Sequence, residues 1–258
     1  MKKRVFSNIL CFIFLPLLTV GLPTALLATA ADEPAYDWYF KANDTHTRPA
    51  LLPEADFLDQ YKDVIALGPD EKVIYLTFDA GFDNGNMSKI LDTLQQKQVP
   101  AAFFVDGNFV KNEPDLVTRI CKEGHILGNH SLSHADMSTL RDFEQYKEQI
   151  AGWERAVDAV GGTPSKFFRF PCGRFSERAL DYNEQLGLKS VFWSFAYYDW
   201  DVNKQPSPDA ALEKALSRAH NGCVMLLHSV SATNAQILPE LIERLRSEGY
   251  SFKSLNEI

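Results

Sequence analysis

Polar residues of the kinds that carry out hydrolysis follow several apolar runs of this sequence. Asp79 comes directly after the run 73–78. A carboxylate at the end of a buried strand has left the core, so it faces solvent, a partner or a substrate. His130 and His134 follow the apolar piece 125–128, and two imidazoles at that spacing converge on one metal ion if the backbone holds them on one face. This pattern raises the question of whether the chain supplies the other parts of a metal-assisted hydrolase.

Three further polar side chains hold similar places in the sequence. Arg169 ends an apolar run, Asp199 lies in the loop after the next run, and His228 directly follows another. Taken singly, each has an ordinary structural explanation, such as an ion pair for Arg169 and Asp199 or a hydrogen-bonded core position for His228. In a β/α barrel, however, the carboxyl ends of the strands form the rim where active sites are built. The joint pattern therefore favours one shared site.

Apolar segments rich in β-branched and aromatic residues predict the strands that position these side chains. The seven predicted strands are 73–78, 101–105, 125–128, 167–169, 190–193, 223–227 and 251–253. The predicted helices between them are 87–98, 114–123, 138–160, 176–186, 208–219 and 233–248. Six strand–helix units closed by a seventh strand indicate an α/β protein with a parallel sheet, either a barrel or an open doubly wound sheet.

The first 70 residues differ from the rest. Residues 1–30 combine a basic start, an apolar run and Ala28-Thr29-Ala30, which predicts a cleaved signal peptide; an uncleaved membrane anchor is the alternative. We therefore expect an exported protein on the cell-wall side of the membrane or outside the cell. Residues 31–70 are interpreted as an N-terminal extension that docks through its aromatic residues or forms part of a binding surface. The catalytic domain is assigned to 71–258.

Charge excludes one class of function. The formal net charge is −8, and removal of the basic residues in 1–30 would make the remaining chain more acidic. Phosphate contacts need a basic face, so a nucleic-acid partner is not expected. No segment indicates a stable protein partner.

Five ordered motifs carry a resemblance to a known family. They are Thr77-Phe78-Asp79-Ala80-Gly81, His130-Ser131-Leu132-Ser133-His134, Arg169-Phe170-Pro171-Cys172-Gly173, Asp199-Trp200 and Leu226-Leu227-His228. This series is similar to that of the polysaccharide deacetylases, the carbohydrate esterases of family four, over about 71–258. The resemblance implies a distorted seven-stranded (β/α) barrel with parallel strands, and metal-dependent hydrolysis of N-acetyl groups on amino sugars.

The resemblance also implies roles for the catalytic residues. Asp79 would be the general base, held ionised by Arg169, since a nearby cation favours the carboxylate. His228 would be the general acid that protonates the leaving amine. Asp199 would pair either with His228 or with Arg169. The predicted substrate-binding residues are Trp200, Leu226, Asn84 and Pro171.

The implied metal site departs from the family pattern at one position. His130 and His134 would bind a divalent ion, for which zinc is expected, but Ala80 stands where the family has an aspartate as third ligand. Zinc catalysis usually relies on three protein ligands plus water. Weak binding is therefore expected, with Asp83, Asn84 or additional water completing the shell.

The segments 79–86, 192–200 and 228–231 resemble one subgroup, the spore-cortex muramic δ-lactam de-N-acetylases. The implied substrate is N-acetylmuramic acid in the glycan strands of peptidoglycan. Two alternatives remain: a deacetylase of N-acetylglucosamine in peptidoglycan or chitin-like oligomers, and a non-catalytic glycan-binding module. The second alternative is disfavoured because binding alone needs neither a general base such as Asp79 nor a general acid such as His228.

Overall fold

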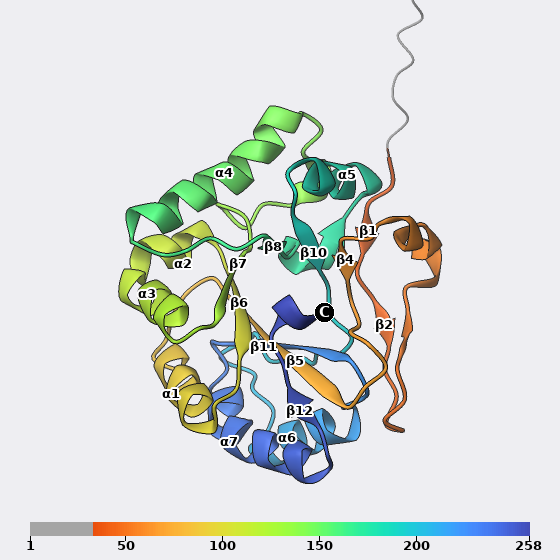
Figure 1. The fold of residues 1–258 in the computed structure, drawn as a ribbon, viewed down its shortest axis with the longest axis vertical. Coiled ribbons are helices and arrows are strands. Elements are labelled where there is room, and N and C mark those ends of the chain that lie inside the picture. The colour runs from red at the N-terminus through yellow and green to blue at the C-terminus, as the bar shows by residue number, and fades with distance from the viewer. Residues whose placement is uncertain (1–32) are drawn as a thin grey trace, which may run out of the picture. The chain divides into compact units, whose positions relative to one another are not determined.

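A curled sheet of parallel strands forms the centre of the fold (Figure 1). The computed structural model describes residues 33–258, apart from the side chains of residues 53–55, and the predicted signal peptide lies outside the described residues. The strand order is β11 (Cys223–His228), β5 (Val73–Ala80), β6 (Ala101–Val105), β7 (Ile126–Asn129), β8 (Phe167–Phe168), β10 (Lys189–Val191) and β4 (Val64–Ile65). Every neighbouring pair in this path is parallel. The predicted distorted barrel of parallel strands is confirmed.

The seventh place in this path is taken by β4, which the sequence did not predict. Two residues are too few for a hydrophobic period to be visible. β4 lies inside the segment interpreted as an extension and pairs with β10. The predicted last strand, β12 (Ser251–Phe252), instead pairs with the first residues of β5. Between the two ends of this curled path, Gly68 N donates to Gly222 O, just before β11, at 2.8 Å, and Leu226 N of β11 donates to Phe195 O at 2.9 Å.

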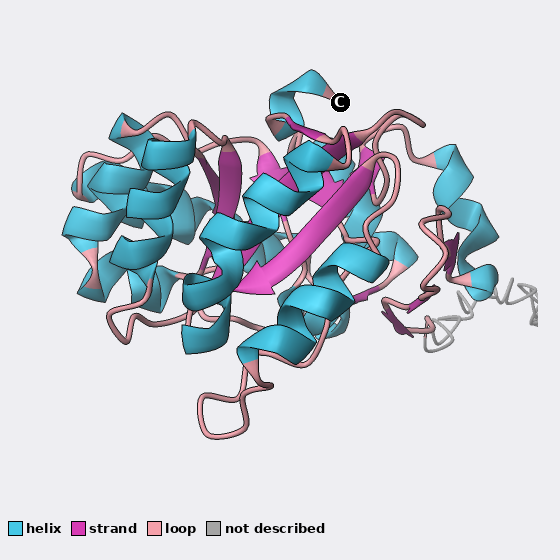
Figure 2. Cartoon of the chain, turned by 90° about the horizontal axis from the view of Figure 1, so that it is seen from below, coloured by secondary structure: helices cyan, strands magenta, loops and turns pink. Residues whose placement is uncertain are grey.

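Helices cover the outside of the sheet in an arc that runs from α4 through α3 and α1 to α7 and α6 (Figure 1). Figure 2 shows them from another side as an outer layer over the strands. Their bounds are α1 (Met87–Lys97), α2 (Gly107–Asn112), α3 (Pro114–Lys122), α4 (Phe143–Ala159), α5 (Glu177–Gln185), α6 (Pro208–Ser217) and α7 (Ala232–Ser247). Within residues 33–258, none of the helices is both long and apolar enough to cross a bilayer.

The structure differs from the predicted helices at two places. The predicted helix 138–160 is a 3₁₀ turn, Met137–Thr139, followed after a break by α4. The break has a local cause, because the Asp142 side chain accepts a hydrogen bond from Gln145 N at 2.9 Å and so caps the start of α4. The short helix α2 was missed; Asp106 caps it in the same way, accepting from Phe109 N at 2.8 Å.

The segment before the barrel packs against it through aromatic rings. Trp38 is buried, stacks on Phe192 with ring centroids 4.2 Å apart, and donates its indole N–H to Trp193 O at 2.8 Å. Tyr39 is exposed. The remaining short elements are β1 (Tyr36–Asp37), which pairs with β9 (Arg174–Phe175), β2 (Phe40–Lys41), which pairs with β3 (Ala50–Leu51), and the 3₁₀ helices Pro53–Gln60, Pro171–Gly173 and Leu255–Glu257.

Alternation along β5 separates two sides of the sheet. Val73 and Tyr75 belong to the apolar cluster that fills the barrel interior, together with Phe104 of β6. Ile74, Leu76, Phe78 and Ala80 belong to the cluster between the sheet and the helices. Because successive side chains of a strand point to opposite faces, Asp79 shares the interior face, at the mouth of the barrel, and Ala80 shares the helix-facing side.

Candidate active site

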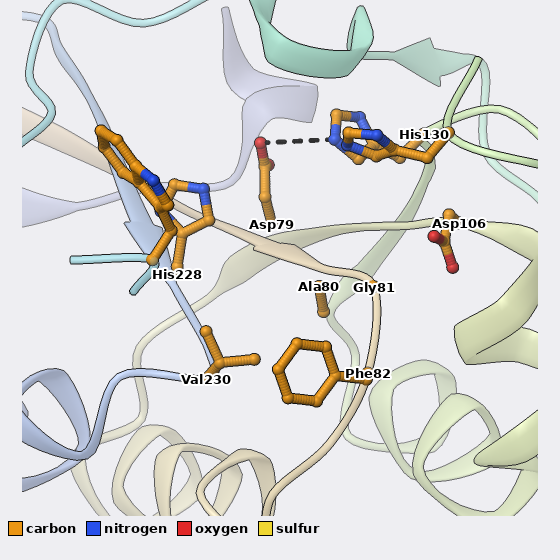
Figure 3. Close-up of a pocket in the computed structure, with 10 residues that line it drawn as sticks. Asp79, Ala80, Gly81, Phe82, Asp106, His130, His228 and Val230 are labelled. Atoms are coloured by element: carbon orange, nitrogen blue, oxygen red, sulfur yellow. Dashed lines mark ion pairs between the residues drawn. The ribbon is translucent and has the colours of Figure 1, made fainter. Parts of the chain in front are cut away.

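A cavity of about 330 Å³ opens at the carboxyl ends of the strands (Figure 3). Its lining comprises Asp79, Ala80, Gly81, Phe82, Asp106, His130, His134, Trp200, His228 and Val230. Half of these residues were predicted site residues. They come from the ends of β5, β6, β7 and β11 and from the loops that follow the strands. The parallel topology therefore brings together residues that are far apart in the sequence.

Asp79 forms a buried ion pair with Arg169. The Arg169 guanidinium donates to Asp79 Oδ1 at 2.7 Å and to Thr77 Oγ1 at 3.0 Å, and it lies 4.1 Å from the centroid of the Phe104 ring. Arg169 is fully buried and Asp79 is 7% exposed. Burial alone would raise the pKa of the Asp79 carboxyl, but the Arg169 charge, with smaller contributions from two histidines, lowers the pKa below its usual value. Asp79 is therefore a carboxylate at neutral pH.

His130 is held as a neutral ring with one free nitrogen. Its Nδ1 lies 2.8 Å from Arg169 O, and since a carbonyl oxygen only accepts, Nδ1 carries the hydrogen and Nε2 has a free lone pair. Nε2 lies 3.7 Å from Asp79 Oδ2. Burial lowers the pKa of His130 to about 4. A neutral imidazole with a free Nε2 is the form that binds metals.

The loop that carries the two histidines is tightly held. His134 is exposed, and its ring centroid lies 4.9 Å from that of His130. Ser131 and His134 have left-handed backbone conformations, with φ of 66° and 54°. Non-glycine residues adopt this region at a cost, and they do so mostly where the surroundings hold them. Here Gly107 N donates to Ser131 O at 3.2 Å and Ala135 N donates to Ser131 Oγ at 3.1 Å.

On the opposite side of the cavity, His228 pairs with Asp199. The His228 Nδ1 lies 2.7 Å from Asp199 Oδ1, and His228 N donates to Asp199 Oδ2 at 2.9 Å. Asn234 also donates to Asp199 Oδ2, at 2.6 Å. Burial would lower the pKa of His228, but the hydrogen bond to the Asp199 carboxylate raises it above its usual value. Of the two partners predicted for Asp199, the structure selects His228.

The residues present fit a divalent ion held by few protein ligands. Within residues 33–258, no group of three or more His, Cys, Asp or Glu side chains is arranged to hold a metal. Asp83, a suggested third ligand, accepts from Gly85 N at 2.9 Å and from Met87 N at 3.2 Å. Asn84, the other, donates to Val230 O at 2.8 Å. Both side chains are thus engaged in contacts within their loop. The two imidazoles, together with water, therefore remain as ligands for the ion.

The predicted substrate-binding residues separate into two groups. Trp200 lines the cavity, is 51% exposed and lies 5.8 Å from the His228 ring. Leu226, Pro171 and Asn84 lie outside the cavity lining, because Leu226 and Pro171 are buried and the Asn84 amide is turned to Val230. Leu226 and Pro171 were assigned from family motifs alone, which do not show whether a side chain reaches solvent.

The other five residues of the lining were not predicted as site residues: Ala80, Gly81, Phe82, Asp106 and Val230. Asp106 directly follows the predicted strand 101–105. The rule that selected Asp79 and His228, a polar residue at the carboxyl end of a strand, would also have found Asp106.

Replacement of Arg169 is expected to destabilise the fold. Arg169→Ala leaves the Asp79 carboxylate buried without its cation, and removing one partner of a buried pair costs about 3–5 kcal/mol. Arg174→Ala is the control, because the half-exposed Arg174 makes only surface ion pairs, each worth about 0–1 kcal/mol. Urea unfolding of both variants measures the difference, and equal stabilities would show that the buried pair is unimportant.

A parallel β/α barrel with a buried carboxylate, two adjacent histidines and a histidine–aspartate pair around one cavity defines a barrel-type hydrolase. Comparison with known proteins then gives the family: the polysaccharide deacetylase pattern matches residues 66–191. The chain belongs to the polysaccharide deacetylase family. It is accordingly an enzyme of the class that hydrolyses N-acetyl amide bonds.

Individual relatives lie within the same family. The peptidoglycan-N-acetylmuramic acid deacetylase PdaA of Bacillus subtilis is 38% identical over 91% of this chain and 89% of its own. A peptidoglycan-N-acetylglucosamine deacetylase of Bacillus cereus is 34% identical over 73% of this chain and 69% of its own. The solved structure of B. subtilis PdaA, described as a family 4 carbohydrate esterase, superimposes with a TM-score of 0.83 over 86% of this chain and 96% of that one.

Proposed function

We propose that this protein removes the acetyl group from N-acetylmuramic acid in the glycan strands of peptidoglycan. The observation that carries the proposal is one cavity with an ionised carboxylate, Asp79, on one side and a carboxylate-paired histidine, His228, on the other. Amide hydrolysis needs both a base for water and an acid for the departing amine.

Each side chain at or next to the cavity has a separate role in the proposed reaction. Bound at His130 and His134, a divalent ion would polarise the amide carbonyl and acidify a water molecule. Asp79 accepts the proton of the attacking water, and Arg169 keeps the carboxylate ionised and oriented. His228 donates a proton to the leaving amine, and Asp199 holds the ring in position. Trp200 offers an exposed aromatic face beside His228 against which a sugar ring can pack.

The muramic substrate is supported by similarity over nearly the whole chain. The match to PdaA covers most of both proteins, whereas the match to the glucosamine deacetylase of B. cereus covers about seven-tenths of each. The freed amine of a muramic residue can close a δ-lactam with its own lactyl carboxyl, which is the modification of spore cortex. We place the enzyme outside the cytoplasmic membrane, exported through residues 1–30, because peptidoglycan lies there.

Replacement of Asp199 is expected to shift the pH dependence of the reaction. The His228 pKa is raised above 6.5 by Asp199, so the protonated acid is lost as the pH rises through that raised value. In Asp199→Asn the lowering effect of burial prevails, and the alkaline limb of kcat/KM moves to lower pH. The control is Asp201→Asn, because Asp201 bonds Tyr198 and Asn203 instead. An unmoved limb in Asp199→Asn would remove His228 from the acid role.

Acetate release tests the proposed function as a whole. Purified full-length protein supplied with zinc should release acetate from peptidoglycan. An N-acetylglucosamine deacetylase, which is the alternative function, would release acetate from N-acetylglucosamine oligomers as well. A non-catalytic glycan-binding module would bind either polymer and release no acetate. Absence of acetate from peptidoglycan, or release from N-acetylglucosamine oligomers alone, would therefore overturn the proposal.

A further inference from the structure

Asp106 lies in the cavity and has no part in the reaction described above. Its side chain is 4% exposed, and its Oδ1 accepts from Phe109 N at 2.8 Å, which caps α2. Asp106 lies on the same side of the cavity as His130, whereas His228 and Val230 lie on the opposite side (Figure 3). Asn108 also bonds the carboxylate, and the Asp106 side chain lines the cavity beside these contacts.

The strand register puts Asp106 beside Ala80, and both residues line the cavity. In β6, Ala102 and Phe104 belong to the interior cluster, and Asp106 follows them at the same two-residue interval. Ala80 pairs with Val105, and both belong to the cluster that faces the helices. Asp106 N donates to Ala80 O at 3.3 Å. The two positions are thus adjacent in the sheet and both border the cavity, and Asp106 is the one of the two that brings a carboxylate.

Asp106 differs from the other carboxylates at the cavity in its ion pairing. Asp79 is paired with Arg169, and nearby Asp199 is paired with His228. Within the described part of the chain, Asp106 makes no ion pair with Lys, Arg or His. Imidazole ligands are neutral when they bind a metal, so His130 and His134 alone leave a divalent ion uncompensated. Asp106 is a further carboxylate that lines the same cavity as the two imidazoles, and it interacts electrostatically with His134.

We propose that Asp106 replaces the family carboxylate missing at Ala80, by compensating the charge of the metal ion and accepting hydrogen bonds from its bound water. This inference rests on the proposed function. Action through water, and not direct ligation, agrees with the finding that no three-residue metal cluster exists within residues 33–258. Outer-shell carboxylates of this kind typically raise metal affinity about 10–100-fold.

Calorimetric titration with zinc alone tests the assignment. Chelator-treated, full-length Asp106→Asn should bind zinc about 10–100-fold more weakly than the unaltered protein. Asparagine keeps the size and the cap of the side chain and removes only the charge. The matched control is Asp142→Asn, which makes the same change at the exposed cap of α4 and should leave zinc affinity unchanged.

Asp106→Ser provides a second test, because serine also caps helices but brings no carboxylate. Both Asp106 variants should lose the same affinity, and thermal unfolding of the chelated proteins should show losses no larger than that of Asp142→Asn. Unchanged zinc affinity in folded Asp106 variants, while the unaltered protein still releases acetate from peptidoglycan, overturns this inference alone. Absence of acetate release by the unaltered protein overturns the proposed function instead.

Discussion

Asp79→Asn is expected to lower the rate of acetate release at least about a hundredfold, the usual contribution of general acid–base catalysis. Asparagine has nearly the same shape as aspartate but cannot accept the proton of the attacking water. The assay is acetate release from peptidoglycan by zinc-loaded protein. Near-normal release would reassign Asp79 to a structural role.

Stability has to be measured alongside that rate. A residue at the end of a strand is usually replaceable without harm to the fold. Asp79, however, is only 7% exposed and accepts a hydrogen bond from the fully buried Arg169, so its replacement also affects the stability of the fold. Asparagine still offers an oxygen to Arg169, so Asp79→Asn should lose less stability than Arg169→Ala. Unfolding by urea separates a rate effect from a loss of folded protein.

Removal of the metal is expected to abolish most of the activity, and added zinc should restore it. His134→Ala should weaken zinc binding by more than about a hundredfold, because loss of a ligand exceeds the 10–100-fold effect of an outer-shell partner. Zinc concentrations that restore the activity of the chelated, unaltered protein should then fail to restore the activity of His134→Ala. Acetate release after exhaustive chelation and stepwise addition of zinc gives the comparison.

His46→Ala is the matched control for that variant. His46 is also exposed and also has a left-handed backbone, with φ of 56° against 54° for His134, but it bonds Ala219 O outside the cavity. It should respond to chelation and zinc as the unaltered protein does. Full activity of exhaustively chelated protein would contradict the metal mechanism.

Much of the architecture could be predicted because it is encoded locally. A run such as 73–78 is long enough for its strand character to show, and a polar residue at its end predicts the rim of a parallel sheet. On this basis Asp79, His130 and His228 were placed correctly in one cavity. Residues that act at strand ends are visible in the sequence even when they are far apart in it.

The remainder depends on tertiary contacts that no short pattern reports. The choice of His228 as the partner of Asp199 follows from the approach of the Asp199 loop to the end of β11, and β4 is a strand only because β10 lies beside it. The capping bond of Asp142 decides where α4 begins. Whether Leu226 reaches the cavity depends on the burial of its side chain, which motif similarity does not define.

Mass spectrometry of peptidoglycan treated with the purified protein tests the central claim most directly. The glycan is digested to defined fragments after incubation with zinc-loaded protein, and Asp79→Asn serves as the inactive control. We predict fragments lighter by one acetyl group on muramic residues, with N-acetylglucosamine residues unchanged and with no such loss in the control. Loss of acetyl from glucosamine residues instead, or an unchanged mass spectrum, would contradict it.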